Sequence, residues 1–225
     1  MNIWQSPPGH VAIAALLLLS GCTDDGPQTA DSSAVASTIV QTNPATEATT
    51  ASSLDDGDSE SSGSNRLAVL PTREGPRKET TGSVPHIQVG TEPVPAVDAE
   101  LRRRVFLIPG IEERESQISL PGARSLWLAE ELELARPEVL QVGREFGHFH
   151  PDGSLHLWMP VDRAQEVEAT KWGELHPWVD RDDYWDGIVM IYIPETADDA
   201  DIALQLVVDT YNNIVGTNLD PASVE

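Results

Sequence analysis

The sequence has few features that would cross-link the chain or hold it in a membrane. Cysteine occurs once among 225 residues, as Cys22, so no disulfide can form within the chain. The longest purely apolar run, residues 11–19, has nine residues. A membrane-spanning helix needs about 20. A folded domain in this chain must therefore be held together by packing, and the apolar run is too short to cross a bilayer.

Aromatic residues are missing from a long stretch of the chain. No Phe, Trp or Tyr lies between Trp4 and Phe106, and the other eleven aromatic residues lie between Phe106 and Tyr211. A stretch without aromatic side chains can hardly build a hydrophobic core. We therefore expect one folded domain in the C-terminal half, where about 120 residues are enough for a core.

Basic residues are also scarce. Lysine occurs twice, at Lys78 and Lys171, and the formal net charge is −23. A surface this acidic repels phosphate backbones and anionic lipid headgroups. We predict that the protein binds no nucleic acid and that the domain surface does not adhere to membranes.

The N-terminal segment has the features of an export signal. The apolar run leads into Leu19-Ser20-Gly21-Cys22, which resembles the bacterial lipobox, in which the cysteine is acylated. We predict a signal peptide over residues 1–21, lipidation at Cys22, and a bacterial cell-envelope location outside the cytoplasm with a membrane anchor. The segment departs from the pattern in having no Lys or Arg before the run. The alternative is a buried helix that ends in a free cysteine.

The composition divides the rest of the chain into three parts. Residues 22–65 are rich in Ser, Thr, Ala and Asp and contain no basic residue, which predicts a disordered acidic tether. Residues 66–95 contain many Pro and Gly residues and are predicted to form an extended arm. Residues 96–218 are predicted to be the folded domain.

The pattern of apolar residues in the domain predicts an α+β fold. The expected elements are a helix capped by Asp98 and stopped at Pro109-Gly110, strands over residues 115–120 and 125–128, a hairpin over 145–160, a helix from Asp162 to Gly173, a central strand over 187–193, and a last helix capped by Thr196 with Asp199. Hairpins without a βαβ rhythm indicate an antiparallel sheet flanked by helices.

The hairpin over residues 145–160 sets the candidate site. Pro151-Asp152-Gly153 suits a three-residue loop. This loop pairs His150 with Ser154, His148 with His156, and Phe146 with Trp158. One face of the hairpin is then wholly apolar, formed by Gly147, Phe149, Leu155, Leu157 and Met159, and is expected to face the core. The three histidines lie together on the other face, between two aromatic residues.

These histidines, with neighbouring polar and aromatic residues, are the candidate binding site. The predicted ligand-binding residues are Glu145, His148, His150, His156, Trp158, Glu174 and His176. Imidazoles with carboxylates suit zinc or another divalent transition metal. We therefore take His148, His150 and His156 as candidate metal ligands. The alternative is that they are half-exposed strand residues with a structural role.

Other residues give weaker indications. Asp152, Ser154 and His156 would be close enough for a nucleophilic serine, but Ser154 lies in a turn and outside a G-x-S-x-G elbow. Trp178 is a candidate for the rim of a pocket, whereas Trp172 and Trp185 are expected in the core. The acidic segment 180–186 lacks the spacing of a calcium loop.

Several segments resemble the bacterial luciferase-domain family. They are R-V-F-L-I-P-G-I-E-E-R, S-L-P-G-A-R-S-L-W-L, E-F-G-H-F-H-P-D-G-S-L-H-L, W-G-E-L-H-P-W and V-M-I-Y-I-P, within residues 85–218. The family name implies light emission and gives no catalytic residues. We expect a lipid-anchored protein that binds a small ligand or metal at the His/Trp face. The alternatives are an oxidase, monooxygenase or hydrolase working at that face, and a structural envelope lipoprotein.

Overall fold

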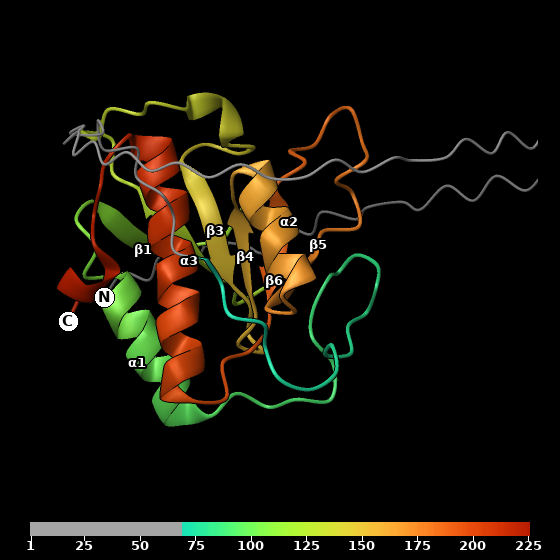
Figure 1. The fold of residues 1–225 in the computed structure, drawn as a ribbon. Helices are drawn as coiled ribbons and strands as arrows, with labels where there is room; N and C mark the ends of the chain where they lie inside the picture. The colour runs from blue at the N-terminus through green and yellow to red at the C-terminus, as the bar shows by residue number, and fades with distance from the viewer. Residues whose placement is uncertain (1–68) are drawn as a thin grey trace, which may run out of the picture. The chain divides into compact units, whose positions relative to one another are not determined.

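The computed structural model describes residues 69–225, and Figure 1 shows their fold. The predicted signal peptide, the lipidation site Cys22 and the tether all lie outside the described residues. Within residues 69–225, no helix has the length and apolar character needed to cross a membrane.

The described residues form three α-helices and one six-stranded antiparallel sheet, which confirms the predicted α+β fold. The sheet order is β1-β2-β3-β4-β6-β5. The strands are β1 Ile111–Glu115, β2 Arg124–Leu128, β3 Glu145–Phe149, β4 Leu155–Trp158, β5 Gly173–Leu175 and β6 Ile188–Ile191. The helices are α1 Pro95–Val105, α2 Val161–Ala169 and α3 Ala197–Val215, with 3₁₀ turns at Pro137–Val139 and Pro221–Ser223. Figure 1 shows the three helices on one side of the sheet.

The predicted hairpin register is confirmed. His148 pairs with His156, Gly147 with Leu157, and Phe149 with Leu155. The loop closes as expected, because His150 N–H donates to the Ser154 carbonyl and Gly153 takes a positive φ of 91°. The apolar face packs toward the helices, so the histidines lie on the opposite face of the sheet.

Strand β6 and helix α3 agree with the sequence pattern. Strand β6 lies between β4 and β5 with all its residues buried, as expected of a central strand. Helix α3 starts at the predicted cap, where Asp199 N–H donates to Thr196 Oγ1 at 3.1 Å. It ends at Gly216, which has a left-handed conformation.

Three predicted boundaries are wrong. Helix α1 begins at Pro95 without a side-chain cap and ends at Val105, and Asp98 lies inside its first turn, where it pairs with Arg102. A proline at the first helical position needs no cap for its missing N–H. Helix α2 ends at Ala169, four residues before Gly173, because Lys171 takes a positive φ of 67° and turns the chain into β5.

The strand predicted over residues 115–120 is also wrong. Strand β1 ends at Glu115, where the predicted strand begins. The next residues turn away from the sheet because Ser116 Oγ and Gln117 N–H both donate to the carboxylate of Glu145. This turn places residues 118–121 over the histidine face.

The arm packs on the domain. The described part of the arm, residues 69–94, has a single isolated bridge, between Thr80 and Gln88. Its side chains Leu70, His86 and Gln88 are 5%, 2% and 3% exposed.

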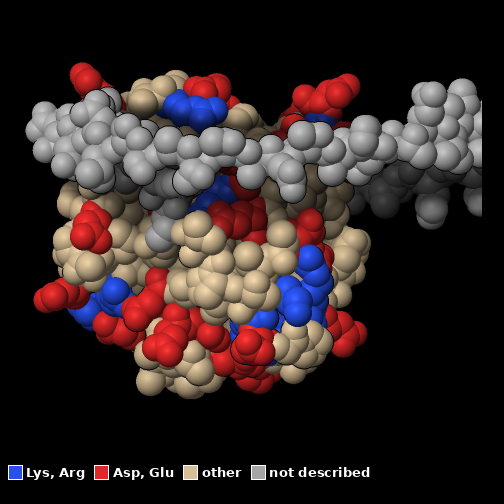
Figure 2. All heavy atoms as spheres, in the orientation of Figure 1, with Lys and Arg blue, Asp and Glu red and all other residues tan. Residues whose placement is uncertain are grey.

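Figure 2 shows acidic side chains over much of the drawn surface, with basic side chains beside them. The absence of nucleic-acid binding stays a prediction.

Gly147 should not tolerate a side chain. A Cβ there would lie 2.6 Å from the His156 carbonyl oxygen and 2.8 Å from Leu157 Cδ2. We expect Gly147→Ala to lower the free energy of unfolding by about 1–3 kcal/mol, measured by urea denaturation. Equal stability of Gly147→Ala and the wild type would contradict the close strand approach.

Candidate functional site

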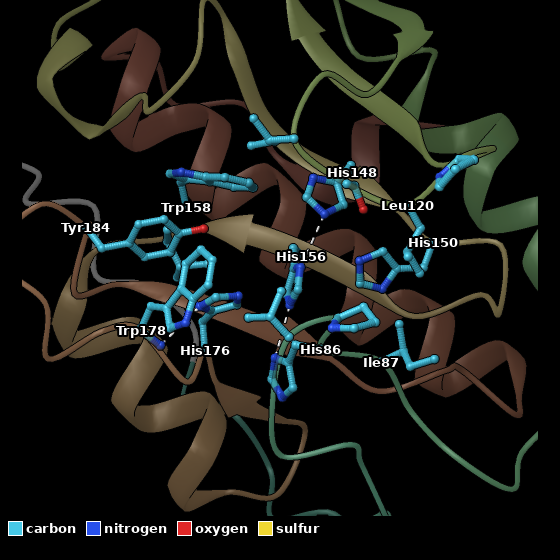
Figure 3. A pocket seen from close by; sticks show the side chains of 16 residues that line it. His86, Ile87, Leu120, His148, His150, His156, Trp158, His176, Trp178 and Tyr184 are labelled. Carbon is cyan, nitrogen blue, oxygen red and sulfur yellow. Dashed lines mark hydrogen bonds between the residues drawn. The ribbon is translucent and has the colours of Figure 1, made fainter. Parts of the chain in front are cut away.

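A cavity of about 350 Å³ lies over the histidine face of the sheet. Its floor consists of five imidazoles, from His86, His148, His150, His156 and His176. Figure 3 shows these rings turned toward one another. Residues 84–87 of the arm and residues 118–121 form two of its walls, and Trp158, Trp178 and Tyr184 form an aromatic third.

Most of the predicted site residues line this cavity. His148, His150, His156, Trp158 and His176 are among the lining residues. The histidines are 3–5% exposed, so the alternative in which they are half-exposed strand residues is wrong. Phe146 was expected beside them, but it belongs to the hydrophobic core.

The two predicted carboxylates lie behind the imidazoles and do not line the cavity. Glu145 is fully buried, and its Oε1 accepts from His148 Nδ1 at 2.9 Å. The register of β2 and β3 skips Phe146 at this point, since Leu126 pairs with Gly147 and Trp127 pairs with Glu145. This irregularity shifts the alternation by one residue and brings Glu145 to the face of His148.

Glu145 keeps its charge in this buried position. Burial raises the pKa of its carboxyl, but hydrogen bonds from His148, Ser116 and the Gln117 N–H outweigh burial and lower it overall. A charged carboxylate can only accept hydrogen bonds. The Nδ1 of His148 therefore carries a proton, and in the neutral ring its Nε2 presents a lone pair.

His150 is held by a second carboxylate through a serine. Ser154 Oγ donates to Asp152 Oδ1 at 2.8 Å and lies 2.8 Å from His150 Nδ1. Because the hydroxyl proton is committed to Asp152, Nδ1 of His150 must be the donor and Nε2 has the lone pair. The same contacts argue against a nucleophilic Ser154, which is fully buried and has its proton directed away from His156.

His86 is a site residue that the sequence analysis missed. Its Nε2 lies 3.0 Å from Glu174 Oε1, and its Nδ1 lies 3.2 Å from His156 Nε2. Because His86 donates to the carboxylate, its Nδ1 accepts from His156 Nε2. The Nδ1 of His156 then presents a lone pair, 3.2 Å from Nε2 of His148.

The hydrogen bonds thus direct three lone pairs to one place. One ring nitrogen each from His148, His150 and His156 lies within 4.8 Å of the other two. When His148 is neutral, its Nε2 and the Nδ1 of His156 face each other with both lone pairs, 3.2 Å apart. A cation would relieve this contact, and a metal ion could bind all three nitrogens.

A second group of three histidines, His86, His156 and His176, is also close enough to hold an ion. It fits less well. The His176 Nδ1 accepts from Trp178 N–H at 3.2 Å, so its other nitrogen carries the proton. The Nδ1 of His86 already accepts from His156. The predicted set of His148, His150 and His156 is therefore the better candidate.

Burial favours the neutral form of His150, His156 and His176. Desolvation, followed by repulsion from the neighbouring histidines, lowers the pKa of His150 to about 3 and that of His176 to about 4. The same causes lower the pKa of His156 well below its usual value of 6.5. Neutral imidazole is the form that binds a metal.

The aromatic residues fall into two groups. Tyr184 stacks on His176 with ring centroids 5.1 Å apart, and Trp178 packs edge-on against both rings. Trp172 and Trp185 have structural roles, as expected, because their indole N–H groups donate to the Pro71 and Met159 carbonyls.

Comparisons with known proteins agree with the resemblance in the sequence. Residues 143–208 match the family model described as "Luciferase domain". A protein from Armillaria gallica described as "Luciferase" is 27% identical over 127 residues, which cover 49% of this chain and 47% of that protein. The chain thus spans about half the length of this relative. No solved structure matches the chain.

Proposed function

The chain contains a luciferase-like domain, and we propose that this domain binds a divalent transition metal through His148, His150 and His156. The observation that carries the proposal is the set of hydrogen bonds behind the ligands. Each ring uses its other nitrogen in a chain that ends at a carboxylate: Glu145, Asp152 or Glu174. Metal-binding histidines are commonly oriented by such contacts.

The distances suit a metal ion of ordinary size. Zn–N bonds of about 2.0–2.1 Å place tetrahedral ligand nitrogens roughly 3.3 Å apart. The observed separation of His148 Nε2 and His156 Nδ1 is 3.2 Å. Three imidazole ligands favour zinc, copper, nickel or iron over magnesium and calcium, which prefer oxygen ligands.

Three protein ligands leave a coordination position for a small molecule. Metal sites with three histidines and one open position are typical of catalytic centres, whereas structural sites are closed by four protein ligands. The histidines form the floor of the 350 Å³ cavity. Its walls are mostly apolar and aromatic, as in sites for small organic molecules. We infer that a small molecule binds in this cavity, at the metal.

Among the catalytic alternatives, oxidation has more support than hydrolysis. The relative is described as "Luciferase", a name that denotes a light-emitting enzyme. A serine hydrolase would need a nucleophilic Ser154, whose hydroxyl is buried and donates to Asp152. An oxidase or monooxygenase is therefore the second candidate function for this site.

Metal binding can be tested on the full chain. After treatment with a chelator, the protein should bind one zinc ion per chain, measured by calorimetry and elemental analysis. His148→Ala, His150→Ala and His156→Ala should each abolish this binding. His176→Ala is the matched control, because it removes a cavity imidazole outside the ligand set and should keep the zinc. Zinc binding that survives all three ligand changes would refute the site.

We also propose that the domain is held outside the cytoplasm by a lipid on Cys22. The support is the short apolar run that leads into Leu19-Ser20-Gly21-Cys22. Cys22→Ser should abolish labelling by radioactive palmitate and release the protein from the membrane fraction. Labelling that persists in this variant would end the lipoprotein interpretation.

A further inference from the structure

The arm meets the hydrogen bonds behind two of the three candidate ligands. Through His86 it supports His156, as described above. Two residues further on, Gln88 N–H donates to Asp152 Oδ2 at 3.1 Å, and Asp152 is the carboxylate behind Ser154 and His150. The domain alone, without the arm, would lack both contacts.

The arm shares a third contact with the site. Thr80 Oγ1 donates to Glu174 Oε1 at 2.9 Å, the same oxygen that accepts from His86. The Gln88 side chain in turn accepts from Ile193 N–H at 2.9 Å, just beyond the end of β6. The groups that hold the arm in place are therefore largely the groups that orient the imidazoles.

Away from the site the arm has attachments of its own: Leu70 lies in the hydrophobic core, and the Trp172 indole N–H donates to the Pro71 carbonyl at 2.6 Å. Arg73 pairs with Glu195 and Asp199, and Lys78 pairs with Glu195. These side chains are partly buried, with Arg73 10% and Lys78 23% exposed. The side chain of His86, by contrast, is fully buried. Residues 80–88 are thus attached to the domain through the site, whereas residues 70–78 have contacts elsewhere.

We propose that the arm is a working part of the metal site and that His86 is its positioning residue. This inference rests on the proposed metal site. The Nδ1 of His86 accepts a hydrogen bond from the Nε2–H of His156. This contact fixes the ring form of His156 in which its own Nδ1 points to the metal. A metal that needs this form binds best when the arm is docked.

The link must act in both directions. If docking of the arm strengthens metal binding by some factor, then metal binding strengthens docking by the same factor. Because the arm joins the N-terminal part of the chain to the domain, a change that undocks the arm would also weaken metal binding at the site. The metal would in turn hold residues 84–87 over the cavity.

The first test compares two changes at His86 in the full chain. His86→Leu cannot accept from His156, and we expect zinc affinity to fall by about 10- to 100-fold, the usual effect of losing such a supporting contact. His86→Asn can accept through Oδ1 near the position of Nδ1. It should keep most of the affinity, within about five-fold of wild type.

The outcomes separate this inference from the metal site itself. If the wild type binds no zinc, the proposed function fails. If the wild type binds zinc and His86→Leu binds it equally well, only the role of the arm is refuted. Equal losses in the Leu and Asn variants would show that His86 acts by packing, which also overturns the proposal. Circular dichroism establishes that each variant is folded.

The second test measures how zinc binding affects the docking of the arm. Trypsin can cut the arm after Arg73, Arg77 and Lys78. Zinc should slow these cuts about ten-fold or more in the wild type and should have little effect in His86→Leu. Mass spectrometry measures the rate of each cut. The variant digested with the same zinc controls for inhibition of the protease. Equal protection of both proteins would contradict the coupling.

Discussion

Lowering the pH of the metal-free protein from 8 to 5 should remove at least about 4 kcal/mol from its free energy of unfolding. In the folded protein His150 has a pKa of about 3 and His176 a pKa of about 4, both lowered first by burial. In the unfolded chain both return to about 6.5. Each histidine therefore contributes roughly 2 kcal/mol of the loss.

The sign follows from where the protons bind. Between pH 6.5 and about pH 4 the histidines of the unfolded chain bind protons, whereas the buried imidazoles of the folded protein do not. Acid therefore favours unfolding. The stability is fully present above pH 6.5 and is lost as the pH falls toward the folded-state pKa values. His156, whose pKa is also lowered by burial, adds to the loss. Asp209 acts in the opposite direction, because burial raises its pKa, but it is a single group.

Urea denaturation at several pH values in the presence of a chelator measures this loss. The transition midpoint should decrease steadily below pH 6.5. Replacing one titrating group, as in His176→Asn, should reduce the loss between pH 8 and pH 5 by about 2 kcal/mol. A midpoint that is the same at pH 5 and pH 8 would show that the imidazoles are not buried in neutral form.

The hairpin shows what local sequence determines. The turn Pro151-Asp152-Gly153 fixes which residues oppose one another, and the apolar face fixes which side meets the core. Both constraints act over a few residues and agree, so the pairing of His148 with His156 could be predicted and is confirmed. The chemistry of the candidate ligands followed from the same register.

The role of His86 could not be predicted in this way. It lies 70 residues before its partner His156, in a segment with neither helical nor strand periodicity. Its position depends on where the whole arm crosses the sheet, which no local pattern reports. The composition of the arm, with many Pro and Gly residues, indicated only an extended arm, while its contacts with the domain bring His86 against His156.

The predicted strand over residues 115–120 failed for a related reason. Its alternation of polar and apolar residues is genuine, but a buried carboxylate 29 residues away binds Ser116 and pulls the chain out of the sheet. The irregular pairing of β2 and β3 that exposes Glu145 to Ser116 is not visible in the sequence either. Tertiary hydrogen bonds outweigh local strand preference at this position.

Glu145 is the residue on which these observations converge. It was predicted to contact the ligand, but it lies behind His148 and also holds the turn that leads to residues 118–121. We expect Glu145→Gln to lower zinc affinity by about 10- to 100-fold, because a neutral amide is a weaker acceptor for His148 Nδ1–H and reduces the basicity of Nε2. The amide also places an N–H group against one of the donors that the carboxylate satisfies.

Calorimetric titration with zinc measures this effect, and two comparisons locate its cause. Glu113→Gln removes a charge of the same sign at the surface, where Glu113 pairs with Arg124, and should leave zinc affinity unchanged. Glu145→Leu leaves the His148, Ser116 and Gln117 donors without an acceptor and should also lower the free energy of unfolding by several kcal/mol. If Glu145→Gln binds zinc as tightly as the wild type, the carboxylate does not orient His148, and the hydrogen bonds behind the ligands lose their significance as support for a metal site.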